Sequence, residues 1–115
     1  MKFLIVDDNA EMRASIKLNL RRFAPEFREC GDGAEALETF IDFRPDWVLM
    51  DLAMPRTDGI AATRAIVAAD PQAKVCIVTN YDDDELRAAS RQAGARAFFV
   101  KDDLTELRRF IESQT

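Results

Sequence analysis

The stretch Trp47-Val48-Leu49-Met50-Asp51 is a short apolar run that ends abruptly in a carboxylate. Its length and uninterrupted hydrophobicity, with Pro45-Asp46 in front of it, are typical of a strand that is buried on both faces of a sheet. Other runs of similar length lie on either side of it, at 3–6, 75–78 and 97–100, with a weaker alternating one at 27–30. We therefore predict five strands.

Stretches of helical periodicity separate these runs, so strands and helices alternate along the chain. The second predicted helix has Leu37, Phe40 and Ile41 on its inner face, and the fifth has Asp103 as its candidate N-cap with Glu106 three residues on. The five predicted helices are marked by apolar residues within 12–23, 37–41, 60–67, 86–93 and 104–111. This alternation predicts a doubly wound α/β fold, with a five-stranded parallel sheet and five helices, in one domain over residues 1–115.

Composition excludes several classes of function. The net charge is −5 and no basic block occurs, so we expect no direct nucleic-acid binding by this domain. Histidine is absent, which removes the commonest zinc ligand and the commonest general base. Cys30 and Cys76 lie in predicted strands and are interpreted as buried thiols. The apolar runs are too short to span a bilayer, so we expect a soluble, cytoplasmic protein without a membrane partner.

Polar side chains follow four of the predicted strands at a shared offset. Asp7 and Asp8 follow the first run, Asp51 the third, Thr79 the fourth and Lys101 the fifth. The carboxyl ends of parallel strands meet at one edge of the sheet, where ligands bind in folds of this class. Three neighbouring carboxylates repel one another, and a hard divalent cation such as Mg²⁺ relieves that repulsion. An Asp beside Mg²⁺ and Lys is a plausible nucleophile toward phosphorus.

Each of these residues also has an ordinary explanation when it is taken alone. The pair Asp7-Asp8 is compatible with a turn and a helix cap, and Asp51 with a solvated strand end. Thr79 is compatible with a β-branched strand residue, and Lys101 with a surface charge. Their matched positions at four strand ends favour a joint phosphoryl-transfer site over these separate explanations.

The same residues resemble those of the receiver domain of two-component response regulators. The resemblance runs from residue 3 to about 111 and is closest to receivers that precede helix-turn-helix output domains. It rests on the pair Asp7-Asp8, the stretch 51-DLAMPRTDG-59, Thr79 and Lys101, with the stretches 32-DGAEAL-37 and 93-AGARAF-98 in addition. It implies the flavodoxin-like strand order 2-1-3-4-5. In that order Cys30 and Cys76 lie roughly 14 Å apart, too far for a disulfide.

The resemblance also implies a role for each site residue. Asp51 matches the phosphoacceptor. Asp8, Asp51 and the backbone carbonyl of Ala53 match the Mg²⁺ ligands, and Asp7 matches a residue that acts mostly through a metal-bound water. The remaining implied roles are phosphoryl binding by Thr79 and Lys101, and conformational switching by Thr79 and Phe98.

The implied partners follow from the same family. They are a sensor histidine kinase or phosphotransfer protein, which supplies the phosphoryl group, and a C-terminal DNA-binding output domain in the full-length protein, which would make the chain a transcription regulator. The implied output surface is the fourth helix, fifth strand and fifth helix, here 83–92 and 98–113. The implied state is a monomer or a phosphorylation-dependent dimer. No turnover of a free substrate is expected, only self-catalysed phosphorylation and dephosphorylation of Asp51.

Three residues depart from the family's usual pattern. Asp102 stands where many members have a proline after a cis bond, so we expect a trans bond after Lys101. Phe98 lacks the hydroxyl of the more usual tyrosine. Thr57 replaces an apolar residue, which is expected to loosen the loop after Asp51.

Other classes of protein remain as alternatives. A phosphohydrolase of the haloacid-dehalogenase type also uses a strand-end Asp with Mg²⁺, but it needs a second acid where this chain has Ala53. A degenerate receiver that signals without phosphate is a second alternative. A nucleotide-binding flavodoxin relative is disfavoured by Asp8-Asn9-Ala10, which lacks a glycine-rich phosphate loop.

Overall fold

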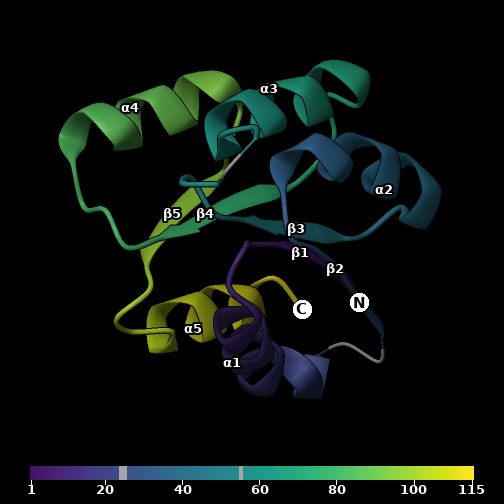
Figure 1. Cartoon of the computed structure of the whole chain (residues 1–115). Coiled ribbons are helices and arrows are strands. Elements are labelled where there is room, and N and C mark those ends of the chain that lie inside the picture. Colours follow the sequence, from purple (N-terminus) through teal and green to yellow (C-terminus); the bar gives the residue numbers. More distant parts are fainter. Residues whose placement is uncertain (24–25, 55) are drawn as a thin grey trace.

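One parallel β-sheet, covered by helices on both faces, forms the centre of the molecule (Figure 1). The computed structural model describes residues 1–23, 26–54 and 56–115. The strands are β1 (Lys2–Val6), β2 (Glu26–Cys30), β3 (Trp47–Met50), β4 (Val75–Thr79) and β5 (Ala97–Val100). The α-helices are α1 (Ala10–Leu20), α2 (Ala36–Phe43), α3 (Gly59–Ala69), α4 (Asp84–Ala93) and α5 (Thr105–Ser113), and two short 3₁₀ helices are η1 (Arg21–Phe23) and η2 (Gly33–Glu35). The predicted α/β class is confirmed.

The strand order is β2-β1-β3-β4-β5, which confirms the flavodoxin-like order. All neighbouring strands are parallel, and Val6 of β1 pairs with Cys30 of β2 on one side and with Met50 of β3 on the other. At the far side of the sheet Thr79 of β4 pairs with Val100 of β5. The carboxyl ends of the strands are therefore aligned along one edge. The order reverses between β1 and β3, which is where such folds bind ligands.

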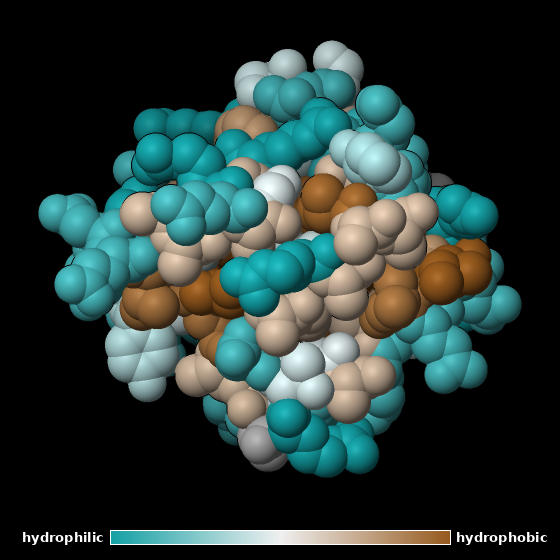
Figure 2. Space-filling view, turned by 90° about the horizontal axis from the view of Figure 1, so that it is seen from above, coloured by the Kyte–Doolittle hydropathy of each residue, from teal (hydrophilic) through white to brown (hydrophobic). Residues whose placement is uncertain are grey.

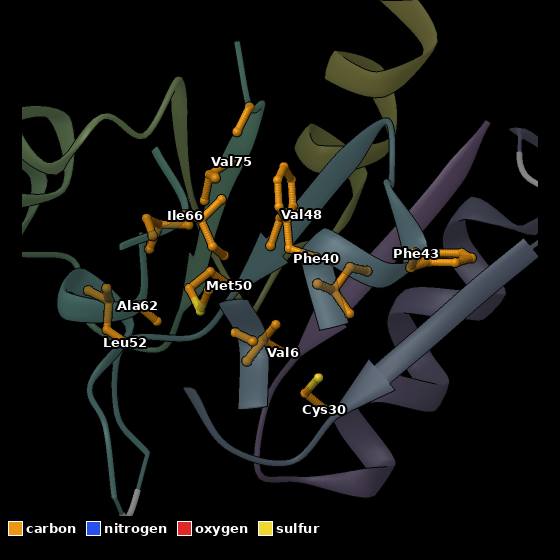
Figure 3. Packing of buried hydrophobic residues seen from close by; sticks show 14 residues of the cluster. Val6, Cys30, Phe40, Phe43, Val48, Met50, Leu52, Ala62, Ile66 and Val75 are labelled. Carbon is orange, nitrogen blue, oxygen red and sulfur yellow. The ribbon is translucent and has the colours of Figure 1, made fainter. Parts of the chain in front are cut away.

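Two separate hydrophobic layers lie on the two faces of the sheet. Successive strand residues point to opposite faces, so Leu4 and Val6 contribute to one layer while Phe3 and Ile5 contribute to the other. Figure 3 shows the first layer, which helices α2 and α3 cover. Helices α1 and α5 cover the second (Figure 1). Burial on both faces explains why the strands read as uninterrupted apolar runs.

The two cysteines are free and buried, as predicted. Strands β1 and β3 separate β2 from β4, and Cys30 belongs to one hydrophobic layer while Cys76 belongs to the other. Burial raises the pKa of the Cys76 thiol to about 12. Both thiols are therefore small apolar side chains of the core.

Two local predictions about helices are wrong. Ile41 is 51% exposed, because the buried stripe of α2 runs through Ala36, Phe40 and Phe43 and residue 41 lies about 100° around the helix from Phe40. Asp103 is not the N-cap of α5, which begins at Thr105 with Leu104 as its N-cap, so no capping box with Glu106 forms. The carboxylate of Asp103 still accepts a hydrogen bond from Thr105 N at 2.9 Å, as in an Asx turn.

The molecular surface over α2, α3 and α4 mixes apolar residues with hydrophilic ones (Figure 2). Within the described ranges, no helix combines the length and the apolar character that crossing a bilayer requires. The bond between Lys101 and Asp102 is trans, as expected, because the described residues contain no cis peptide bond. Pro55, part of the predicted loop after Asp51, lies outside the described residues.

Candidate functional site

The hydrogen-bond ladder of the sheet continues one residue beyond strands β1 and β3, and this holds the two buried acidic residues in place. Asp7 N donates to Cys30 O at 3.0 Å, and Asp51 N donates to Val6 O at 2.9 Å. At the other side of the site, Lys101 N donates to Thr79 O at 2.8 Å. Each backbone is therefore fixed by the sheet itself, so the side chains project from rigid positions.

Lys101 joins two carboxylates that come from different strands. Its Nζ lies 2.8 Å from Asp7 Oδ2 and 3.3 Å from Asp51 Oδ2. All three side chains are almost fully buried. Burial by itself lowers the pKa of Lys101, but the hydrogen bonds and negative charges of Asp7 and Asp51 outweigh it, so the pKa is raised. The ammonium therefore stays charged at neutral pH.

Asp7 has partners for both of its carboxylate oxygens. Oδ2 faces Lys101, and Oδ1 accepts a hydrogen bond from Asn9 N at 2.9 Å. The backbone carbonyl of Asp7 accepts a hydrogen bond from Arg13 Nη1 at 2.6 Å, and Glu29 holds the Arg13 side chain through an ion pair of 3.0 Å. The first acidic residue is thus oriented by α1 and β2 as well as by Lys101.

Asp51 lies in a less favourable setting for a charged carboxylate. Desolvation raises its pKa, and the charge of Asp7 raises it further, while Lys101 and the amide of Leu52 oppose these effects. Leu52 N donates to Asp51 Oδ1 at 2.9 Å. Gly59, the first residue of α3, packs directly on the Asp51 backbone, since a Cβ there would lie 1.9 Å from Asp51 O. A buried carboxylate with a raised pKa gains most from an additional cation.

The site has the donor set of a hard divalent cation. Asp7, Asp8 and Asp51 each offer a carboxylate oxygen, and these oxygens lie within 4.8 Å of one another. The three carboxylates together carry a formal charge of −3, and the Lys101 ammonium, which contacts two of them, balances one unit of it. Asp8 and Ala53 are exposed while Asp7 and Asp51 are buried, so one side of the cluster opens to solvent. An open oxygen-rich site of this kind suits Mg²⁺, which keeps several of its waters.

The two residues predicted to switch lie beyond this cluster. Thr79 is completely buried at the end of β4, and its Oγ1 accepts a hydrogen bond from Tyr81 N at 3.4 Å. Phe98 is half-buried in β5, and the guanidinium of Arg87 covers its ring at 4.6 Å from the centroid. Arg87 in turn pairs with Asp82 at 2.9 Å.

Sequence reasoning placed Asp7, Asp8, Asp51 and Lys101 at one edge, and the structure brings them together there. Sequence patterns did not predict the supporting contacts of Arg13 and Arg87. Arginines on helices and loops carry no sequence signal for a particular partner, because their long side chains reach several neighbours.

Comparisons with known proteins agree with this geometry. The family model of the response regulator receiver domain matches residues 3–112. The transcriptional regulatory protein PrrA of Mycobacterium tuberculosis is 35% identical over 100 residues, which cover 87% of this chain and 43% of that protein. The oxygen regulatory protein NreC of Staphylococcus aureus is 35% identical over 104 residues, which cover 88% of this chain and 48% of that protein. The chain thus spans about half the length of the curated relatives it matches.

A solved structure shows the same fold over nearly the whole chain. The two-component response regulator of the LuxR family from Aurantimonas sp. SI85-9A1 superposes with a TM-score of 0.89 at 30% identity, covering 98% of this chain and 83% of that one. The matching family model, the relatives and this fold lead to one assignment. The chain belongs to the receiver domain family of two-component response regulators.

Proposed function

We propose that Asp51 accepts a phosphoryl group from a sensor histidine kinase or a phosphotransfer protein. The observation that carries the proposal is the buried Asp51 carboxylate, 3.3 Å from the Lys101 ammonium and within a cluster of three acidic residues at the carboxyl edge of the sheet. Desolvation strips a carboxylate of the water that would otherwise weaken it as a nucleophile, while Lys101 keeps part of its charge balanced.

The proposed transfer is a displacement at phosphorus. One carboxylate oxygen of Asp51 forms the new bond to phosphorus, and the bond between phosphorus and the nitrogen of a phosphohistidine breaks. The nitrogen keeps the electron pair of the broken bond. Lys101 neutralises phosphoryl oxygens in the product, and Thr79 donates a hydrogen bond to one of them. No general base is required, because an ionised carboxylate has no proton to lose. The absence of histidine from the chain is therefore compatible with this step.

Mg²⁺ is proposed as the resident cation. Asp8, Asp51 and the backbone carbonyl of Ala53 would bind it directly, and Asp7 would act through a bound water. When bound, the ion supplies positive charge that offsets the surplus of the carboxylates and the charge of the phosphoryl oxygens. The solvent-exposed position of Asp8 and Ala53 supports the proposal, because the phosphoryl donor has to approach from that side.

The phosphorylated state is proposed to bias Thr79 and Phe98 toward a second arrangement. Phosphoryl oxygens would draw the Thr79 hydroxyl away from Tyr81 N, and Phe98 would turn into the space that is released. This change would reach the surface made by α4, β5 and α5. We infer that this surface controls a partner or an attached DNA-binding output domain, since the transcriptional regulatory protein PrrA and the oxygen regulatory protein NreC are both about twice as long as this chain.

The remaining features of the proposal follow from this role. Residues 1–115 act as a single receiver domain, located in the cytoplasm, and do not turn over a free substrate. The domain is monomeric or dimerises when phosphorylated.

Incubation of the purified chain with acetyl phosphate and Mg²⁺, followed by intact-mass spectrometry, tests the proposal. We expect one added phosphoryl group, which is lost in Asp51→Asn and when the metal is chelated. Asp42→Asn, the same substitution at an exposed pair with Arg28, is the matched control and should be modified like the unaltered chain. An unaltered chain that gains no mass, or an Asp51→Asn variant that still does, contradicts the proposal.

A further inference from the structure

The turn after β2 is tied to the loop after β3 by a buried carboxylate. Asp32 Oδ2 accepts hydrogen bonds from the backbone N of Arg56 at 3.0 Å and from its Nε at 3.3 Å. The other oxygen, Oδ1, accepts from Ala34 N at 2.8 Å and caps η2. One side chain therefore satisfies its own turn and also reaches a loop that is 24 residues away in sequence.

The backbone bond contributes more to this tie than the ion pair. The Asp32 side chain is 7% exposed, whereas the Arg56 side chain is 65% exposed, so solvent screens the guanidinium much more than the carboxylate. Arg56 Nη2 also reaches Glu35 Oε1 at 3.3 Å, but this pair is exposed as well. The hydrogen bonds from Ala34 and Arg56 lower the pKa of Asp32, so the carboxylate is charged at neutral pH.

A second contact between the same two segments involves no charge. A Cβ at Gly33 would lie 2.7 Å from the backbone oxygen of Thr57 and 3.2 Å from Met54 Cε, so the turn rests directly against the loop. The loop is closed at its base by a hydrogen bond of 2.9 Å from Gly59 N to Leu52 O. It is thus held at its base by β3 and α3, and farther out by the turn that contains Asp32 and Gly33.

Both chain neighbours of Ala53 contact fixed segments: Leu52 O accepts the hydrogen bond from Gly59 N, and Met54 Cε would lie 3.2 Å from a Cβ at Gly33. A backbone carbonyl binds a metal ion more tightly when its direction is already fixed. If the loop is mobile, metal binding has to order it, and the lost conformational entropy weakens the affinity. Ala53 is exposed and has no side chain that could anchor it, so its direction depends on the two ends of the loop.

We propose that Asp32 is a positioning residue for the metal site: it acts through the Arg56 backbone to hold the loop that presents the Ala53 carbonyl. The inference rests on the proposed function, because that function makes Ala53 a ligand. Gly33 supports the same loop sterically.

Calorimetric titration with Mg²⁺ alone tests the proposal without any phosphoryl transfer. In Asp32→Ser the shorter side chain still accepts from Ala34 N, so the turn keeps its cap and loses only the tie to Arg56. We expect Mg²⁺ to bind about tenfold more weakly, as is usual when a group that orients a metal ligand is removed. Arg56→Met keeps the backbone N–H and should weaken binding less than Asp32→Ser. Asp42→Asn, at a remote exposed carboxylate, should bind Mg²⁺ like the unaltered chain.

A second variant and a second readout keep the test decisive if Asp32→Ser is poorly folded. Gly33→Ala removes no charge but pushes against the Thr57 carbonyl, and it should weaken Mg²⁺ binding in the same direction. Hydrogen exchange of the amides of 53–54 and 56–58, measured without metal, should accelerate in Asp32→Ser while exchange in β1 and β3 stays unchanged.

Failure of the inference is distinguishable from failure of the proposed function. If the unaltered chain binds Mg²⁺ and accepts phosphate while Asp32→Ser and Gly33→Ala bind within twofold of it, the positioning role is wrong and the function stands. If the unaltered chain does not bind Mg²⁺, both are overturned. Unchanged loop exchange in Asp32→Ser also overturns the tie.

Discussion

Replacement of Lys101 by methionine removes the only cation from the centre of the described acidic cluster. At the observed separations of 2.8 and 3.3 Å, and with an effective dielectric constant near 20, the ammonium attracts Asp7 by about 6 kcal/mol and Asp51 by about 5 kcal/mol. The desolvation of the ammonium, which costs several kcal/mol, offsets part of this attraction. Loss of one partner from a buried ion pair destabilises a protein by about 3–5 kcal/mol, because the remaining charge is left uncompensated.

We therefore expect Lys101→Met to lower the free energy of unfolding by about 3–5 kcal/mol at pH 7. The measurement is urea denaturation followed by circular dichroism and by the fluorescence of Trp47, which is buried against Phe110 and so reports unfolding. Lys17→Met is the matched control. Its exposed pair with Glu29 is screened by solvent, so its loss should cost less than about 1 kcal/mol.

The pH dependence and a second substitution check the physical cause. Protonation of Asp51 removes one of the uncompensated charges, so the cost of Lys101→Met should be smaller at pH 5 than at pH 7. Lys101→Met combined with Asp51→Asn should recover part of the lost stability. A loss below about 1 kcal/mol, or a loss that neither low pH nor Asp51→Asn reduces, would refute the view that charge compensation holds this cluster together.

Four shorter predictions concern the same fold. The pKa of Asp51 is raised in the folded state, so protonated Asp51 contributes stability that is fully present below its unfolded pKa and is lost as the pH rises through its folded pKa. The free energy of unfolding of Asp51→Asn, measured by denaturation at several pH values, should lack this decline. Mg²⁺ at 100 times its dissociation constant should raise the free energy of unfolding by about 2.7 kcal/mol, and chelation should reverse this. Gly59→Ala should yield a chain that is unfolded or strongly destabilised by circular dichroism, because the new Cβ would lie 1.9 Å from Asp51 O. Asp83→Ala should cost about 1 kcal/mol in urea denaturation, because the Asp83 carboxylate accepts hydrogen bonds from Glu85 N and Leu86 N at the start of α4.

Trp47 is a suitable probe of unfolding but a poor probe of metal binding. It begins β3 and lies about 13 Å along the strand from Asp51, packed between Phe110 and Lys74 at the opposite edge of the sheet. The closeness of the two residues in sequence does not translate into closeness in space. Calorimetry is therefore the better assay for Mg²⁺.

The elements of this fold could be predicted from local sequence because burial on both faces of a parallel sheet demands short, continuous apolar runs. The carboxyl end of each run is then a fixed position at one edge, so the residue type that follows it is informative. Asp7, Asp51 and Lys101 were found in this way. Helix ends were less predictable: the exposed Ile41 and the failed capping box at Asp103 depend on how each helix is rotated and where it starts, which neighbouring elements decide.

By itself, the sequence determined the α/β class, the strand boundaries to within a residue or so, and the set of chemical groups that gather at the carboxyl edge. These features depend on hydrophobic periodicity and on the geometry common to all parallel sheets. Only the tertiary structure decided which of those groups pair. Lys101 lies closer to Asp7 than to Asp51, and Asp32, which the sequence presents as a turn residue, reaches across to Arg56. Such contacts join segments far apart in the chain, and their distances depend on how the loops pack, which no local pattern encodes.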